Sequence, residues 1–262
     1  MEKYSGVVNT SGQIIVKKQS SVLSKSLLVA GIAFGLMFLF SFLLFWVLDK
    51  TIGSNPQSNV IDLLYIVSIV SIIAVMIMSI YVSFRMAKVK LGTIIAMISL
   101  YAIANGIMFG ILFYAIQHTD GMDSSINMQD FLYCFLITGA VFAICGGVGS
   151  ILSTRFTLSL GKFLMIATFS LLGFLLIFGL ISVFAFHHNF DTLHTVILGV
   201  WGLLMIGYIM FDFSVIRKSQ SFMDLVDDDM QIKYVFLFGF TLLIDLINML
   251  WIIIRIYASL KR

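Results

Sequence analysis

The stretch LLIDLINMLWIIIRI, residues 242–256, places one aspartate, Asp245, inside an otherwise apolar run. A second stretch, GYIMFDFSVI at 207–216, does the same with Asp212. Both runs are long and apolar in the manner of helices that cross a lipid bilayer, where an ionisable group costs roughly 2.5–3.5 kcal/mol on insertion scales. Because that cost requires an explanation, these two aspartates are the first candidates for functional residues.

The whole chain has the composition of a membrane protein. Of its 262 residues 60% are hydrophobic and only 11% are charged, and there is a single proline. A soluble domain of this size would not stay in solution with such a composition. Runs of about 20 nearly charge-free residues predict spanning helices, because a hydrocarbon core of about 30 Å needs that many. We predict seven spans, at approximately 27–48, 61–84, 93–116, 131–153, 163–186, 195–214 and 234–256.

The predicted fold is therefore an all-α integral membrane protein with seven transmembrane helices. Residues 1–26 form a polar tail that lacks the apolar stretch and cleavage site of a signal peptide. Residues 27–258 are predicted to be one transmembrane domain, and residues 259–262 a short basic C-terminus. No connecting loop is long and apolar enough to fold alone.

The basic residues predict which side of the membrane each connection faces, since positively charged loops stay in the cytoplasm. Of the 16 Lys and Arg residues, twelve fall on the side of the N-terminus, namely Lys3, Lys17, Lys18, Lys25, Arg85, Lys88, Lys90, Arg155, Lys162, Arg217, Lys218 and Lys233. The N-terminus is therefore expected in the cytoplasm. The small net positive charge follows from this topology and gives no reason to propose nucleic acid as a partner.

Other polar residues lie close to the two aspartates along the helices. In the last span Asn248 and Arg255 share one face with Asp245, which predicts a polar stripe along that helix. In the sixth span Tyr208 lies one turn before Asp212, which is near the cytoplasmic end of the span. We expect Tyr208, Asn248 and Arg255 to line a pore or to support the aspartates.

The two aspartates are predicted to act together. Consecutive spans are usually neighbours in space, which can bring the two carboxylates into contact. In a low dielectric both cannot stay ionised, so they would share one proton and titrate as a pair near physiological pH. Arg85, at the inner end of the second span, is the natural cationic partner, although its long side chain could equally reach lipid headgroups. The alternative is that each aspartate only caps a helix or pairs with an arginine for packing.

Small residues predict how the helices pack. The fourth span contains GAVFAICGGVGS, residues 139–150, and small residues three or four apart let helix backbones approach closely in lipid. Gly106 and Gly110 have the same spacing in the third span, which we expect to pack against the fourth. Ser150 could be the nucleophile of an intramembrane protease, but no histidine lies inside any span to activate it. We therefore expect no enzymatic activity.

The segment between the sixth and seventh spans is acidic, with Asp224, Asp227, Asp228 and Asp229. It lacks the alternating acidic positions, the central glycine and the final glutamate of an EF-hand calcium loop. A solvated loop, or an acidic first turn of the seventh helix, is the favoured interpretation. The alternative is a mouth that attracts cations on the inner side.

At the two aspartate-bearing stretches the chain resembles the transmembrane Bax inhibitor motif family, including its bacterial members. Further likeness lies in SLYAIANGIMFGIL, residues 99–112, and in the region 135–164, so that it covers about residues 20–260. The resemblance implies a seven-helix bundle with the C-terminal helix surrounded by the other six. It also implies a pH-sensitive calcium leak whose two aspartates hydrogen-bond to each other.

The resemblance further implies roles for individual residues. Asp212 and Asp245 match the family's aspartate pair, which acts as the gate and pH sensor. An arginine of the second helix is expected to pair with the sixth-helix aspartate and to hold the pore closed. That latch residue is Arg85 here, or Lys88 one turn later.

Oxygen chemistry limits how tightly calcium could bind. Ca²⁺ takes six to eight oxygen ligands, whereas the spans offer two carboxylates, Asn248 and a few hydroxyls or carbonyls. We expect Asp212 and Asp245 to form a weak, partly hydrated transit site, with no bound cofactor. The expected function is a pH-gated calcium leak that works with protons and the lipid bilayer, and the expected location is the bacterial plasma membrane. The alternatives are a proton-coupled transporter, or a non-conducting stress-response or interaction protein.

Overall fold

The computed structural model describes residues 5–8, 14–17, 21–51, 59–85, 88–118, 128–184, 191–223 and 225–260. Its helices are α1 (Val22–Thr51), α2 (Asn59–Arg85), α3 (Leu91–His118), α4 (Met128–Ile151), α5 (Thr154–Phe184), α6 (Asp191–Lys218), the short α7 (Gln220–Met223) and α8 (Asp228–Leu260). The described residues thus contain one long helix for each of the seven predicted spans. In the N-terminal tail, β1 (Ser5–Val8) and β2 (Ile14–Lys17) pair as an antiparallel hairpin, with Ser5 opposite Lys17.

The long helices have the length and composition of membrane spans. Within the described residues, α1, α3, α4, α5, α6 and α8 are each long and apolar enough to cross a bilayer, and α2 contributes a shorter apolar run, Ile66–Ile77. Several helices extend beyond the predicted apolar runs. For example, α1 begins at Val22 instead of about residue 27, and α5 begins at Thr154 instead of about residue 163. The reason is that polar residues near the interface continue a helix without being apolar themselves.

The acidic segment before α8 starts that helix. Asp228 and Asp229 lie in the first turn of α8, where negative side chains are favourable because the helix dipole is positive there. The Nζ atom of Lys233 lies 2.7 Å from the Oδ2 atom of Asp229, one turn away. The amide of Gln231 donates to the backbone carbonyls of Met223 and Val226, which ties the connection to α8. The favoured interpretation, a solvated loop or an acidic first turn, is confirmed for Asp228 and Asp229, whereas Asp224 lies outside the described residues.

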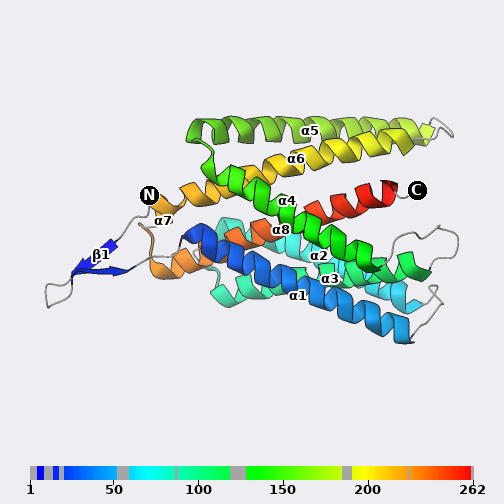
Figure 1. Ribbon diagram of the computed structural model, residues 1–262, viewed down its shortest axis with the longest axis horizontal. Coiled ribbons are helices and arrows are strands. Elements are labelled where there is room, and N and C mark those ends of the chain that lie inside the picture. The colour runs from blue at the N-terminus through cyan, green and yellow to red at the C-terminus, as the bar shows by residue number, and fades with distance from the viewer. Residues whose placement is uncertain are drawn as a thin grey trace.

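Helix α8 lies at the centre of the bundle (Figure 1). Helices α1, α3, α4 and α6 pack most closely against it, whereas α2 packs mainly on the outside of α3 and α5 packs on the outside of α6. The central position of the C-terminal helix is therefore as expected. The six surrounding helices do not contact it equally, because α1, α3, α4 and α6 form an inner shell and α2 and α5 are peripheral.

Glycines mark the tightest helix contacts. A Cβ atom at Gly149 of α4 would lie 2.4 Å from the backbone oxygen of Met210 in α6. A Cβ atom at Gly106 of α3 would lie 2.7 Å from the backbone oxygen of Met37 in α1. The predicted close packing of α4 is confirmed, but the glycine face of α3 packs against α1 and not against α4. Small-residue spacing shows that a helix can approach a neighbour closely, and it does not say which neighbour.

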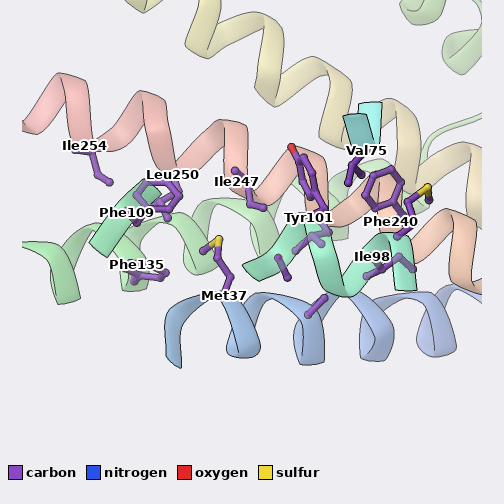
Figure 2. Packing of buried hydrophobic residues seen from close by; sticks show 14 of the residues in the cluster. Met37, Val75, Ile98, Tyr101, Phe109, Phe135, Phe240, Ile247, Leu250 and Ile254 are labelled. Carbon is purple, nitrogen blue, oxygen red and sulfur yellow. The ribbon is translucent and has the colours of Figure 1, made fainter. Parts of the chain in front are cut away.

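Two apolar clusters fill the interior on either side of α8. The first lies among α1, α3 and α8 and includes Met37, Phe109 and Leu250 (Figure 2). The second lies among α4, α6 and α8 and includes Phe213 and Leu246. Asp245 is on α8 between residues of the two clusters, so its carboxyl group is held inside the protein and away from lipid.

The helices alternate in direction, so the bundle has two distinct ends. Arg85, Lys88, Arg155 and Arg217 all lie at or near helix ends on the side where α1 begins. We call this the basic end. At the other end α8 finishes near the start of α4, where the hydroxyl of Tyr257 donates to the Oδ1 atom of Asp130 over 2.5 Å.

Candidate functional site

The structure brings the carboxyl groups of Asp212 and Asp245 together. Asp212 is half-buried on α6, and Asp245 is buried on α8, with only 6% of its surface exposed. The two side chains are hydrogen-bonded to each other. A carboxylate has no hydrogen to donate, so this bond requires a proton on one of the two groups. Together they form a carboxyl pair whose contact would be favoured by one shared proton.

Close packing of α4 on α6 orients Asp212 toward α8. The residues of α6 that α4 contacts, Met210 and Phe213, lie on either side of Asp212 in the sequence. Met210 has its backbone against Gly149, and the ring of Phe213 occupies the space where Gly146 would carry a Cβ atom, 2.4 Å away. Larger residues at these glycines would push α6 outward. The glycines of α4 therefore help to keep the carboxyl pair in contact.

One oxygen of the carboxyl pair has no partner. The Oδ2 atom of Asp245 is buried and makes no hydrogen bond with any residue that the structure describes. A buried polar atom without a partner costs roughly 1–3 kcal/mol, so such atoms are usually found at sites with a function or beside bound water. The hydrogen-bonding capacity of the pair is therefore not fully satisfied, because the Oδ2 atom of Asp245 can still accept a hydrogen bond.

Two polar residues of α3 approach the carboxyl pair from the side opposite α6. Tyr101 and Asn105 are buried, at 4% and 3% exposed, and the Nδ2 atom of Asn105 donates to the backbone carbonyl of Tyr101 over 2.9 Å. Tyr101 is close enough to Asp245 to interact with it electrostatically. Figure 2 shows its hydroxyl directed toward α8. Neither residue was predicted from the sequence, although an asparagine one turn after a tyrosine inside an apolar span is a signal that could have identified them.

The other polar candidates of α6 and α8 do not join the pair. The hydroxyl of Tyr208 lies 2.8 Å from the Oγ1 atom of Thr168, so Tyr208 links α6 to α5. Asn248 is half-buried one turn after Asp245. Arg255 is exposed, with its guanidinium 6.0 Å from the centre of the Trp251 ring. The predicted polar stripe on α8 is thus divided between the interior, at Asp245, and the surface, at Arg255.

Neither latch candidate contacts the carboxyl pair in this structure. Arg85 is exposed at the end of α2, with its guanidinium 6.0 Å from the centre of the Tyr81 ring. Lys88 is also exposed, in the short connection that leads to α3. Within the described residues no ion pair joins either of them to Asp212 or Asp245. The role of a latch stays a prediction.

At the basic end a different set of polar contacts joins α6 to α4 and α5. The Oγ atom of Ser214 lies 2.7 Å from the Oγ1 atom of Thr157, to which Lys218 donates over 2.5 Å. Arg217 donates to the backbone carbonyl of Ser150. These contacts hold the last turns of α6 just beyond Asp212. These contacts were not predicted from the sequence, because serine and threonine in a span have many possible partners.

The site offers few ligands for a tightly bound metal. In the described part of the chain no three His, Cys, Asp or Glu residues lie together as a metal site. The oxygens near Asp245 come from its own carboxyl group, from Asp212 and from the Tyr101–Asn105 pair. Ca²⁺ prefers six to eight oxygens, so these few oxygens do not complete a calcium coordination shell.

The chain matches one protein-family model over nearly its whole length. That model is described as Inhibitor of apoptosis-promoting Bax1, and it matches residues 16–262, which include both aspartate-bearing stretches and α3. A comparison with curated proteins finds no match. The family match agrees with the resemblance noted in the sequence and with the seven long helices. The chain is a member of the Bax1-inhibitor family, the transmembrane Bax inhibitor motif proteins.

Proposed function

We propose that this protein is a pH-sensitive calcium leak in which the carboxyl pair of Asp212 and Asp245 is the gate. The observation that carries the proposal is the hydrogen bond between the two carboxyl groups at the contact of α6 with α8. The bond joins the central helix to a member of the inner shell. Its presence depends on a single proton, and this makes the helix contact sensitive to pH.

Electrostatics favours this pair as a switch over a merely structural contact. With one proton the pair contributes a hydrogen bond, typically worth about 0.5–1.5 kcal/mol net. With no proton, two unit charges about 4 Å apart repel by about 4 kcal/mol at an effective dielectric constant of about 20. The repulsion is larger than the bond that it replaces. Loss of the shared proton therefore favours separation of α6 from α8, and we expect calcium flux to rise as it is lost.

The same carboxylates are suited to the passage of a cation. When both are ionised they offer four oxygens beside Tyr101 and Asn105, which attract a divalent ion but do not complete its shell. Conduction requires a site that an ion can enter and leave, so an incomplete shell favours a leak over storage. Protons and calcium ions would then compete for one pair of carboxyl groups.

We further propose that the basic end faces the cytoplasm, following the distribution of Lys and Arg, and that the protein resides in a bacterial plasma membrane. The latch belongs to a state other than the present one, in which Arg85 or Lys88 approaches Asp212 from α2. Helix α2 packs outside α3, so this state needs movement of α2 at its basic end. Arg85→Gln is expected to raise flux at the pH where wild type is closed.

Calcium entry into liposomes that contain the purified protein tests the proposal. Wild type is expected to show a flux that rises through the pH range in which the pair loses its proton. Asp212→Asn and Asp245→Asn are each expected to remove that dependence, because an amide does not ionise. Asp62→Asn, at the exposed start of α2, is the matched control and should keep the wild-type profile.

The outcomes separate the proposal from its alternatives. An unchanged pH profile in both aspartate variants contradicts the gate. Uphill movement of a solute, driven by a proton gradient and abolished by the same substitutions, indicates a proton-coupled transporter. Intact liposomes without flux at any pH indicate a non-conducting membrane protein.

A further inference from the structure

The unpaired Oδ2 atom of Asp245 raises the question of which group it bonds when the carboxyl pair separates. Asp245 is 6% exposed, so water from the surface has little access to this oxygen in the present structure. A newly ionised carboxylate in the interior would be costly without a donor. The donor must therefore come from a side chain that is already close to Asp245.

Tyr101 is held in the right place to be that donor. Its ring packs edge-on against the ring of Phe240 in α8, with the centroids 5.3 Å apart. It also belongs to the same buried cluster as Leu243 and Ile247, which lie on either side of Asp245 in α8. The ring contact with Phe240 and this shared cluster place the phenol beside α8, and its hydroxyl points toward α8 (Figure 2).

Asn105 fixes the tyrosine further. It lies one turn after Tyr101 on α3, where its Nδ2 atom donates to the backbone carbonyl of Tyr101 over 2.9 Å. The amide is close enough to the phenol to interact with it, and its second N–H can donate to the phenol oxygen. When Asn105 is the donor in that bond, the hydrogen of the hydroxyl is left for another acceptor.

We propose that Tyr101 is a positioning residue of the gate, whose hydroxyl donates to the Oδ2 atom of Asp245 when the hydrogen bond between Asp212 and Asp245 breaks. This inference rests on the proposed function. Asp245 would exchange one neighbour for another, from Asp212 on α6 to Tyr101 on α3. The exchange stabilises the ionised form of Asp245 on the central helix while α6 is released.

The other groups around Asp245 are not suited to this role. From α6 the titratable neighbour is Asp212, which is already the partner in the pair. From α4 the thiol of Cys145 lies in the cluster that includes Leu242 and Leu246, and a thiol is a weak donor. Between Lys25 and Asp49 the sequence of α1 contains no charged residue. Tyr101, by contrast, is a hydroxyl donor that is close enough to Asp245 to interact with it.

The test follows the protonated carboxyl groups directly, by infrared absorption of the purified full-length protein in liposomes as the pH is varied. Tyr101→Phe keeps the ring against Phe240 and removes only the hydroxyl. Loss of a donor to the carboxylate favours the protonated form, so the pH at which the carboxyl band is half lost should rise by on the order of one pH unit. The midpoint of calcium flux should rise with it.

Tyr114→Phe is the matched control, because Tyr114 is equally buried on α3 but lies in a separate cluster with Leu48 and Ile111. It should leave the infrared midpoint at the wild-type value. Asn105→Leu, which removes the amide that orients the hydroxyl, should raise the midpoint by less than Tyr101→Phe. Asn105→Leu therefore provides an independent measurement if Tyr101→Phe does not fold.

The inference and the proposed function fail in different ways. A wild-type infrared midpoint in Tyr101→Phe, with a band that Asp245→Asn removes, overturns the role of Tyr101 and leaves the gate intact. A raised infrared midpoint in liposomes that show no calcium flux supports the hydrogen-bond exchange and contradicts the leak. A midpoint that rises equally in Tyr101→Phe and Tyr114→Phe also overturns the inference, because it indicates a general structural effect.

Discussion

Helices α8 and α5 are similar in length and in apolar character, yet they occupy opposite environments. Most of the apolar stretch of α8, Asp228–Tyr257, is buried by neighbouring helices, whereas almost none of the corresponding stretch of α5, Thr154–Leu175, is buried. Figure 1 shows α5 along the edge of the bundle with α6 beside it. Helix α8 carries a buried acidic residue in its span, Asp245, whereas the charged residues of α5, Arg155 and Lys162, are exposed.

The difference shows that hydropathy reports the environment of a span only on average. A helix that faces lipid must be apolar because the hydrocarbon offers no partner for a polar group. A helix inside the bundle must be apolar where it packs, but it can carry a polar group wherever another helix supplies a partner. An acidic residue is tolerated at Asp245 because Asp212 and Tyr101 face it.

The largest difference in stability is expected between two variants that each lose an aromatic ring, one from the buried centre of the bundle and one from the exposed face of α5. Phe109 of α3 is fully buried and stacks on Trp251 of α8, with ring centroids 4.6 Å apart. Phe169 of α5 is 70% exposed. Phe109→Ala leaves a cavity and should lower the free energy of unfolding by about 3 kcal/mol. Phe169→Ala should change it by less than about 0.5 kcal/mol, because lipid chains fill the space.

Unfolding in mixed micelles, followed by circular dichroism as denaturing detergent is added, measures both variants. Similar losses in the two would show that α5 is as tightly packed as the centre, and the contrast between the helices would disappear. A shift confined to Phe109→Ala would support the division into an inner shell and peripheral helices.

A smaller effect is expected from adding one methyl group to α4. At Gly149 the new Cβ atom would meet the backbone of Met210 at 2.4 Å, and a backbone cannot move aside as a side chain can. Gly149→Ala should cost about 1–3 kcal/mol and should alter the pH dependence of flux, because α6 is displaced beside Asp212. Gly147→Ala is the control, since nothing lies within 4 Å of its Cβ position. Equal stability of the two variants would contradict the close contact of α4 with α6.

The contrast also explains which features of the fold could be predicted from the sequence. The spans were predictable because continuous apolar runs have few other interpretations, and Asp212 and Asp245 stood out as charges within them. The arrangement of the helices was not predictable in the same way. Gly106 and Gly110 signalled a close contact correctly, yet the partner was α1, because the pattern describes one surface and not its complement.

The site was predictable where a residue was unusual for its surroundings and not where it was ordinary. Tyr101 and Asn105 were overlooked because a tyrosine and an asparagine in a span cost far less than a charge, although their spacing places them on one face of α3. Arg85 was selected for its charge, but the charge of a residue does not determine which way its side chain points. In the structure its side chain lies near Tyr81 at the surface.

The smallest expected effect concerns the polar contact that joins the peripheral helix to the inner shell. Thr168 of α5 and Tyr208 of α6 are hydrogen-bonded over 2.8 Å. Thr168→Val keeps the shape and removes the bond, and contacts of this kind in membrane proteins average about 0.6 kcal/mol. Ser170→Ala, on the exposed face of α5, is the control and should have no effect.

Because α5 meets the bundle mainly through α6, Thr168→Val should weaken that one contact in the same detergent titration and leave the pH midpoint of flux at its wild-type value. A changed midpoint would show instead that Tyr208 transmits the position of α5 to Asp212, one turn away, and the peripheral helix would then belong to the gate.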